Sequence, residues 1–342
     1  MYIDGPFYAG LEDAATEAAR LARIGYDGVY TLEGPSDPFM PLVIASEHQP
    51  ELTIGTAVAV AFPRNPSHIA YQAWDLQRFS RGRFRLGIGS QVRAHIEKRF
   101  GVAFDKPASR MADYICAVKA FFRCWQDGER LDHRGEFFQH TLMTPMFNPG
   151  PLEWGAPPIL LGGVGPRMTE VAGEFADGLI VHPFHCLAFL EQQQLPAFER
   201  GIARSGRERD ALDLQVAAMV VTGENEEAYA AAESSIRSLL AFYASTPAYI
   251  PPLEAAGYAE LQPELNRLSK EGRWDEMSER IDDGMLKAFA VCGEPAEIGP
   301  ELTRRYGDFV QRLGIYAPYA QDEGVWTRIL GDLKAARAAR EQ

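Results

Sequence analysis

The sequence predicts a (β/α)8 barrel with insertions, because three of its features point to that fold class. Eight strand-like segments alternate with helix-like segments along the chain. Most of these strands are continuous runs of Val, Ile and Leu, which is typical of strands buried on both faces of a parallel sheet. The length of 342 residues suits one barrel that carries insertions. A doubly wound parallel sheet is the alternative that this alternation leaves open.

The predicted elements follow one another in order, and several helix ends carry clear signals. Gly25 stops the first helix, and Pro66 lies at the start of the third, where proline is tolerated. We expect strands at residues 2–5, 27–32, 51–62, 83–90, 157–163, 177–182, 213–221 and 310–318. We expect helices at residues 11–24, 38–48, 66–80, 107–126, 166–176, 187–204, 225–243 and 295–306, followed by a C-terminal helix rich in Ala and Arg.

Two stretches interrupt this rhythm and are interpreted as insertions in one domain that spans residues 1–342. Residues 128–157 favour a hairpin or extended excursion followed by turns. Residues 245–290 contain the run STPAYIPP and an acidic helix around 274–288. This second insertion carries or adjoins aromatic residues that either shape a substrate pocket or lid or belong to a local core: Phe242, Tyr243, Tyr249 and Trp274.

Composition and charge exclude several classes of protein. The chain is 46% hydrophobic and 24% charged, with a formal net charge of −13 and no basic run, so a nucleic-acid partner is not expected. It shows neither a signal-peptide pattern nor an apolar stretch long enough for a membrane span, so we expect a cytoplasmic protein that does not enter membranes. The spacing of its four cysteines does not match that of a metal-binding finger. We expect all four to be free thiols: Cys116, Cys124, Cys186 and Cys292.

The turn after the fifth predicted strand is a candidate anion site. In a barrel, functional residues lie at the carboxyl ends of the strands. Here Gly162, Gly163 and Gly165 precede a helix that begins at Pro166. The free amides and the dipole at the start of a helix favour a phosphate or carboxylate, and Arg167 adds a positive charge. A simple connecting turn is the alternative.

Other strand ends offer room for a flat ligand. Gly89 and Ser90 end the fourth strand, where small residues leave space for a ring or a phosphate tail, although a tight turn explains them equally. The third strand alternates alanines with Val58, Val60 and Phe62, and these small side chains either leave space for a ring system or reflect tapered barrel packing.

Two titratable residues at strand ends are candidates for proton transfer. Glu33 ends the second strand and His182 ends the sixth, although each is also consistent with an ordinary rim residue. The chain has no H-x-H or H-E-x-x-H metal pattern and no G-x-S-x-G nucleophile motif. A barrel mouth with so few reactive groups usually takes its chemistry from a cofactor, and no metal is expected.

Two long segments carry a family resemblance. The segments GTAVAVAFPRNPSHIAYQAWDLQRFSRGRFRLGIGSQ at 55–91 and PPILLGGVGPRMTEVAGEFADGLIVHP at 157–183 are similar to signatures of the luciferase-like monooxygenase superfamily. Within it the chain resembles the branch that depends on coenzyme F420, a deazaflavin, from about residue 2 to 320. The resemblance implies a bacterial luciferase-like barrel, with a flavin or deazaflavin across the strand ends, and a homodimer.

The resemblance also assigns cofactor-binding residues. It implies a non-prolyl cis peptide at Ala57–Val58 behind the ring, and it leaves Glu33 in place to contact the ring. The loop after the fourth strand, which would line the cofactor, consists of Gly89, Ser90 and Gln91. The phosphate loop consists of Gly162, Gly163, Val164 and Gly165, next to Arg167.

This chain departs from the sugar-phosphate dehydrogenases of that branch. These enzymes have Asp-His after the second strand, where this chain has Glu33 and Gly34, and a glutamate after the fourth strand, where it has Val92. A sugar phosphate is therefore not the expected substrate, and the acid–base roles of the family do not transfer. Glu33 and His182 remain the catalytic candidates of this chain.

We expect an oxidoreductase that transfers a hydride between bound coenzyme F420 and a small organic substrate. A monooxygenase that uses reduced FMN is one alternative, and a non-catalytic flavin-binding barrel is another. The long acidic tail of coenzyme F420 favours basic residues near the rim, and the candidates are Arg64, Arg93 and Arg167.

Overall fold

Eight parallel strands close into a barrel in the computed structural model, which describes residues 1–320 and 322–340. Each strand pairs with the next one in space, and the last pairs with the first. In spatial order they are β1 (Tyr2–Pro6), β2 (Gly28–Thr31), β3 (Thr53–Thr56), β5 (Phe84–Gly89), β8 (Ile159–Gly163), β9 (Gly178–Val181), β10 (Asp213–Val221) and β12 (Arg312–Tyr316). The predicted (β/α)8 barrel is confirmed, and the doubly wound alternative is wrong.

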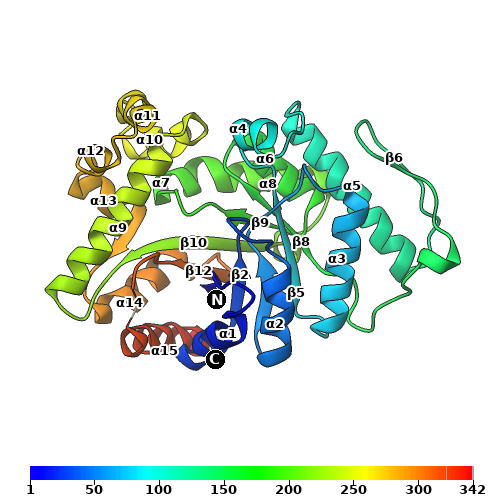
Figure 1. The fold of residues 1–342 in the computed structure, drawn as a ribbon, viewed down its shortest axis with the longest axis horizontal. Helices are drawn as coiled ribbons and strands as arrows, with labels where there is room; N and C mark the ends of the chain where they lie inside the picture. Colours follow the sequence, from blue (N-terminus) through cyan, green and yellow to red (C-terminus); the bar gives the residue numbers. More distant parts are fainter. Residues whose placement is uncertain (321, 341–342) are drawn as a thin grey trace.

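Helices surround the barrel and connect its strands (Figure 1). Their apolar faces pack on the sheet, as with Leu21 and Ile24 of the first helix. The helices between and after the strands are α1 (Ala14–Ile24), α2 (Met40–His48), α3 (Pro66–Phe79), α4 (Arg93–Lys98), α5 (Pro107–Gln126), α6 (Pro166–Phe175), α7 (Leu187–Phe189), α8 (Leu195–Ser205), α9 (Glu226–Ala244), α14 (Pro295–Tyr306) and α15 (Glu323–Arg340). The helix predicted at 187–204 is interrupted by a π-helical turn, Leu190–Gln194.

The third predicted strand, 51–62, is two strands rather than one. β3 ends at Thr56, and a short strand β4 (Ala59–Val60) continues beside β5, with Val60 opposite Gly89. The peptide between Ala57 and Val58, which separates the two, is cis. The cis peptide implied by the family resemblance is therefore present.

The excursion at 128–157 forms a hairpin followed by a loop. Its two short strands, β6 (His133–Arg134) and β7 (Gln139–His140), pair antiparallel, and a 3-10 turn follows at Pro145–Phe147. Figure 1 shows the hairpin beyond α5, away from the barrel. The loop is fixed to α3, because the Tyr71 hydroxyl donates to the Phe147 carbonyl and the Trp74 indole donates to the Gly150 carbonyl.

The insertion at 245–290 contains more helix than the sequence indicates. After a 3-10 turn at Pro247–Tyr249 come α10 (Ile250–Ala256), α11 (Leu261–Glu271), α12 (Trp274–Ser278), α13 (Asp283–Phe289) and a short strand β11 (Ala290–Cys292), which pairs with the end of β10. The single acidic helix predicted around 274–288 is wrong, because the chain breaks before Asp282, whose carboxylate caps α13. These helices and α9 share a hydrophobic cluster distinct from that of the barrel.

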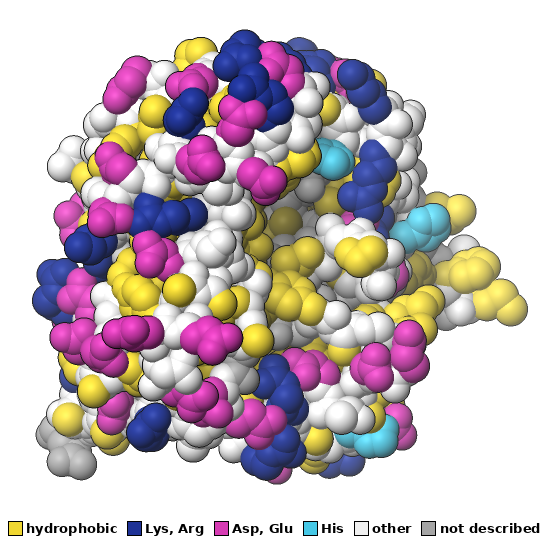
Figure 2. Space-filling view, turned by 60° about the vertical axis from the view of Figure 1, so that its left-hand side comes forward, with side chains coloured by type: hydrophobic (Ala, Val, Ile, Leu, Met, Phe, Trp, Pro, Cys, Tyr) yellow, Lys and Arg dark blue, Asp and Glu magenta, His cyan; other side chains and the backbone are white. Residues whose placement is uncertain are grey.

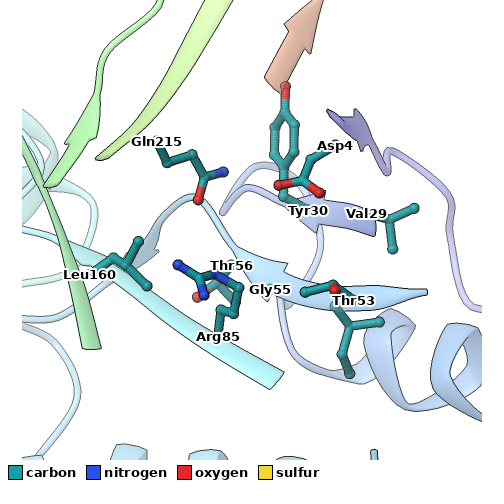
Figure 3. A pocket seen from close by; sticks show the side chains of 10 residues that line it. Asp4, Val29, Tyr30, Thr53, Gly55, Thr56, Arg85, Leu160 and Gln215 are labelled. Carbon is teal, nitrogen blue, oxygen red and sulfur yellow. The ribbon is translucent and has the colours of Figure 1, made fainter. Parts of the chain in front are cut away.

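Polar side chains fill the barrel interior near the amino-terminal ends of the strands. Arg312 donates two hydrogen bonds to Asp4, at 2.7 and 2.5 Å, and Arg85 pairs with Asp213. Figure 3 shows Asp4, Arg85 and Gln215 around an internal cavity of about 10 Å³. This volume suits about one water molecule, so this cavity is too small for a cofactor.

The buried pair of Asp4 and Arg312 generates a stability prediction. Both side chains are less than one-tenth exposed, so replacing Arg312 by Met leaves the Asp4 carboxylate buried without its partner. We expect Arg312→Met to lower the free energy of unfolding by about 3–5 kcal/mol, measured by urea denaturation. Arg23→Met, which breaks an exposed pair with Glu323, should cost about 1 kcal/mol or less. Equal costs for the two variants would contradict the prediction.

Candidate active site

Ala57 and Val58 lie at the carboxyl end of β3, and both residues are half-buried. These two residues are called the wall below. The Val58 side chain occupies the space left by two glycines on neighbouring strands. A Cβ atom on Gly89 would lie 2.7 Å from Val58 Cγ2, and one on Gly162 would lie 2.9 Å from Val58 Cγ1. Gly89 and Gly162 thus make room for Val58, and their absent side chains set the position of the wall.

Glu33 holds the segment that follows this wall. Its Oε2 atom accepts hydrogen bonds from the Val60 amide and from Arg64 Nη1, both at 2.6 Å. Its own backbone amide donates to the Val58 carbonyl at 3.3 Å. Arg64 also donates to the Val60 carbonyl at 2.9 Å, so Glu33 and Arg64 together hold both backbone groups of Val60. The Glu33 carboxylate is therefore engaged by an amide and a guanidinium, and its geometry suits positioning rather than proton transfer.

The loop after β5 is a self-contained turn. Gln91 adopts a positive φ of 57°, and its side-chain oxygen accepts from the Val92 amide at 2.9 Å. The Ser90 hydroxyl donates to the Gln91 carbonyl. Beyond it, Arg93 pairs with Glu97 at 2.7 Å and lies over the Phe104 ring. The arginines at 64 and 93 thus already have protein partners.

The start of α6 has the features of an anion site. Gly165 is the N-cap residue and supplies no side-chain cap, so the first amides of the helix lack that partner. A Cβ atom on Gly165 would have nothing within 4 Å, which leaves the approach to these amides open. Arg167 is exposed and has no hydrogen bond or ion pair to the part of the chain that the structure describes. Amides, dipole and a free guanidinium together suit a phosphate.

Gln194, which the sequence analysis missed, supports this turn from behind. It ends the π-helical turn and is 2% exposed. Its Nε2 donates to the Gly163 carbonyl at 2.7 Å, while its Oε1 has no protein partner among the described residues. A π-helical turn often marks a functional position, but nothing in the sequence around Gln194 indicates it.

His182 lies at the end of β9 with both ring nitrogens engaged. Nδ1 accepts from the Phe184 amide at 3.1 Å, so in the neutral ring the proton is on Nε2, which lies 3.2 Å from the Tyr249 hydroxyl. Burial, together with the nearby His185, lowers the pKa of His182 to about 3. His182 is therefore neutral near pH 7, and it orients Tyr249 rather than exchanging protons.

The aromatic residues of the second insertion divide into two groups. Tyr243 and Tyr249 face His182, with ring centroids 4.9 and 4.7 Å from its imidazole. Phe242 and Trp274 lie on the surface, about half exposed. Tyr243 and Tyr249 also pack against the hydrophobic cluster of the insertion, as the local-core alternative predicts, whereas Phe242 and Trp274 lie outside a buried core.

A separate hollow lies at the ends of β1 and β12, against α1 and the start of α15. It has a volume of about 660 Å³ and is bordered by Tyr8, Ala317, Pro318 and Tyr319, with the ion pair of Glu17 and Arg20 at its edge. On the face of the molecule drawn in Figure 2, a recess is lined mainly by hydrophobic and uncharged atoms, with charged side chains around it. Tyr8 was not among the sequence candidates, because a lone tyrosine after a strand carries no motif.

Comparison with known proteins identifies the family. The family model described as luciferase-like monooxygenase matches residues 4–312. The chain belongs to this family. It is 46% identical over 311 residues to an uncharacterized protein of Mycobacterium tuberculosis, covering 91% of this chain and 92% of that protein.

More distant relatives carry functional names. A 5,10-methylenetetrahydromethanopterin reductase of Archaeoglobus fulgidus is 27% identical over 82% of this chain and 81% of that protein. The structure of a coenzyme F420 dependent tetrahydromethanopterin reductase from Methanopyrus kandleri superposes with a TM-score of 0.80 at 19% identity, covering 96% of each chain, which shows the shared fold.

Family membership makes this chain an oxidoreductase whose cofactor is a flavin or a deazaflavin. The strand ends fit such a group, because they offer a half-buried wall at β3 and an uncapped helix start at α6. Within residues 1–320 and 322–340, no three His, Cys, Asp or Glu side chains are placed to hold a metal ion. None of the helices described there is long and apolar enough to cross a bilayer.

The contact between Val58 and Gly89 generates a test of the wall. An added methyl group would overlap Val58, whose branched side chain has little freedom to move. We expect Gly89→Ala to lower the free energy of unfolding by about 1–3 kcal/mol in urea denaturation. Gly331→Ala, where the new carbon meets nothing within 4 Å, should leave stability unchanged or slightly higher. An unchanged free energy of unfolding in Gly89→Ala would show that the Val58 side chain has room to move.

The lowered pKa values of two histidines predict how stability depends on pH. Burial lowers the pKa of His182 to about 3 and that of His185 to about 4, from an ordinary value of 6.5. Below about pH 6.5 these histidines bind protons in the unfolded chain but not in the folded chain. The free energy of unfolding therefore falls as the pH drops toward 4. Each histidine lowers the free energy of unfolding by up to about 1.4 kcal/mol for each pH unit of this decrease.

His182→Asn should flatten this decline between pH 6.5 and 4, when urea denaturation is repeated at several pH values. His68→Asn, which removes an exposed histidine, should leave the slope as it is. Parallel curves for His182→Asn and the unaltered protein would contradict the assignment of His182 as a neutral, half-buried residue.

Proposed function

We propose that this protein transfers a hydride between bound coenzyme F420 and a small organic substrate at the carboxyl ends of the barrel strands. The observation that carries the proposal is the start of α6, where uncapped amides and the unpaired Arg167 face open space. The kinship with a 5,10-methylenetetrahydromethanopterin reductase and the fold shared with a coenzyme F420 dependent enzyme support it.

The phosphate of the cofactor is proposed to bind the turn Gly162–Gly163–Val164–Gly165, with Arg167 beside it. The Gln194 side chain orients this turn through the Gly163 carbonyl. Because the chain is strongly acidic overall, local amides and one free guanidinium have to supply the attraction. Gly89, Ser90 and Gln91 would border the cofactor from the neighbouring strand.

The ring is proposed to rest on the Ala57–Val58 wall, which Glu33 and Arg64 hold in place from behind. When bound, the deazaflavin supplies the carbon that gives or takes the hydride. The protein contributes orientation and exclusion of water, since the wall is half-buried. Glu33 and His182 then act as positioning residues, rather than as the acid and base that the sequence alone leaves possible.

A monooxygenase that uses reduced FMN is the second candidate function, and the family description favours it. FMN also combines a phosphate with a flat tricycle, so the same turn and wall would hold it. The distinguishing feature is the acidic tail of coenzyme F420, which needs a cation beyond the phosphate loop. Of the three rim arginines, Arg167 is the one that has no protein partner among the described residues.

Titration of the cofactor-free protein with coenzyme F420 and with FMN tests the proposal. We expect submicromolar binding of coenzyme F420 and binding of FMN that is at least tenfold weaker, followed by fluorescence. Tighter binding of FMN would support the monooxygenase, and binding without turnover of any substrate in a panel would support a non-catalytic barrel.

Arg167→Ala should weaken binding of coenzyme F420 by about 5- to 20-fold, because a charge-assisted hydrogen bond contributes roughly 1–2 kcal/mol. The loss should shrink at high salt. Arg93→Ala is the matched control, since Arg93 is also exposed near a helix start but is paired with Glu97, and it should change affinity less than twofold. Equal losses of affinity for coenzyme F420 in the two variants would contradict the proposal that Arg167 binds the phosphate.

Three further expectations stay proposals. We propose that residues 1–342 form one luciferase-like domain, that the protein is a homodimer, and that it acts in the cytoplasm. Sedimentation velocity at micromolar concentration tests the dimer, which should give about twice the mass of one chain.

A further inference from the structure

The turn before α6 and the start of that helix each carry two amides without a partner. Within residues 1–320 and 322–340, no hydrogen bond is found for the amides of Val164 and Gly165 in the turn, or for those of Arg167 and Met168 in the helix. The next amide, that of Thr169, donates to the Gly165 carbonyl at 3.1 Å. For both pairs of amides to reach one phosphate, the turn and the helix have to be held at a fixed spacing.

Gln194 fixes the direction of the turn amides. Its Nε2 atom donates to the Gly163 carbonyl at 2.7 Å. The peptide between Gly163 and Val164 is trans, so its N–H points opposite to its carbonyl. The Val164 amide therefore points away from Gln194. The Val164 side chain packs against the hydrophobic cluster of the second insertion, so this peptide is held on both sides.

The hydrogen bond to Gly163 is what the Gln194 side chain adds to the structure. Gln194 is 2% exposed, and its Oε1 atom has no partner in the described part of the chain. A buried acceptor without a partner destabilises the folded state, and an apolar side chain of the same size would avoid that loss. Packing alone thus gives no reason for a glutamine at this position, whereas the Gly163 carbonyl does.

The π-helical turn determines which glutamine reaches Gly163. It spans Leu190–Gln194 and contains three glutamines in a row, of which Gln192 and Gln193 are exposed and Gln194 is buried. A π-helical turn holds one residue more than an α-helical turn, which rotates the residues on its two sides by about 100° relative to each other. The extra residue thus sets the face of the helix on which Gln194 lies.

The helix that follows Gln194 also holds α6. In Figure 1, α8 runs alongside α6, and two glycines bring the helices close together. A Cβ atom on Gly173 of α6 would overlap the Phe198 carbonyl, and one on Gly201 of α8 would overlap the Glu170 carbonyl. The Glu170 side chain accepts from Arg200 of α8 at 2.9 Å. The helix amides and the turn amides are therefore both placed by α8, the helix through these contacts and the turn through Gln194.

We propose that Gln194 is a positioning residue for the phosphate of the cofactor. It does not touch the phosphate, but acts through the Gly163 peptide by turning the Val164 and Gly165 amides toward the amides at the start of α6. The role rests on the proposed function, because it concerns the turn that the cofactor phosphate would occupy. It assigns to the π-helical turn the task of presenting Gln194 to that site.

Inorganic phosphate is the first probe, because its binding does not depend on which cofactor the protein takes. Titrated into the cofactor-free full-length protein, it should shift the Val164 and Gly165 amide resonances in ¹H–¹⁵N NMR spectra. Gln194→Met keeps the length of the side chain but cannot donate to the Gly163 carbonyl. We expect it to weaken phosphate binding by about 3- to 10-fold. The urea midpoint should stay unchanged, since the variant loses one hydrogen bond and also one unpartnered acceptor.

The second probe is a pair of compounds that differ by the phosphate, namely FMN and riboflavin, or coenzyme F420 and its chromophore without phosphate and tail. Gln194→Met should weaken binding of the phosphate-bearing compound by the same 3- to 10-fold and change that of the phosphate-free compound less than twofold. A variant that only loosened the fold would weaken both.

Gln262→Met is the matched control. Gln262 is also buried, at 7% exposed, and its Nε2 atom donates to the Ser245 carbonyl at 3.1 Å in the second insertion. The substitution removes the same kind of hydrogen bond away from the turn. It should leave the affinities for phosphate, for the cofactor and for the phosphate-free compound unchanged.

Three results would overturn the role of Gln194: no phosphate-dependent shift of the turn amides in the unaltered protein, full phosphate affinity in Gln194→Met, or an equal loss of affinity for the phosphate-free compound. Failure of the proposed function gives a different pattern. If neither coenzyme F420 nor FMN binds, but phosphate binds at the turn and depends on Gln194, the function falls and the positioning role stands. If coenzyme F420 binds equally well to Gln194→Met, only the positioning role falls.

Discussion

One carboxylate, that of Glu33, holds the chain in shape where it leaves β3. Its oxygen accepts from the Val60 amide and from Arg64, while its backbone amide reaches the Val58 carbonyl. These contacts add to the pairing of β4 with β5 and to the hydrogen bond from the Ala61 amide to the Gly89 carbonyl, which hold the segment between β3 and α3 beside β5. The position of Val58 between Gly89 and Gly162, and thus the wall of the site, depends on these contacts.

The site is organised around this fixed wall by two other rigid supports. Gln194 orients the turn before α6 through a buried hydrogen bond, and His182 orients Tyr249 through a ring that stays neutral. Glu33 and His182, the two candidates for proton transfer in the sequence, are thus both engaged in hydrogen bonds that hold neighbouring residues. The groups left without a side-chain partner among the described residues are the first amides of α6 and the Arg167 guanidinium, which suits a protein that binds and orients a cofactor.

The sequence predicted the barrel well, because long apolar runs and glycine or proline at helix ends are local signals. All eight barrel strands lie at the predicted segments. The apolar run at 51–62 does not show the break between β3 and β4, and the residues around Leu195 carry no signal for the π-helical turn before it. The start of α13 was also missed, although the hydrogen bond from the Met285 amide to the Asp282 carboxylate that caps it is local. The sequence analysis assigned no helix to the run STPAYIPP, but Pro251 and Pro252 lie in the first turn of α10, where proline is tolerated.

The ion pairs at the amino-terminal end of the barrel bear on how ligands reach it. The pair of Asp4 and Arg312 is buried and that of Arg85 and Asp213 is partly exposed, and the cavity beside them has room for about one water molecule. A flat ligand could pass this end only if these ion pairs separated. A cofactor and a substrate that bind as proposed would therefore share the entrance at the carboxyl ends of the strands.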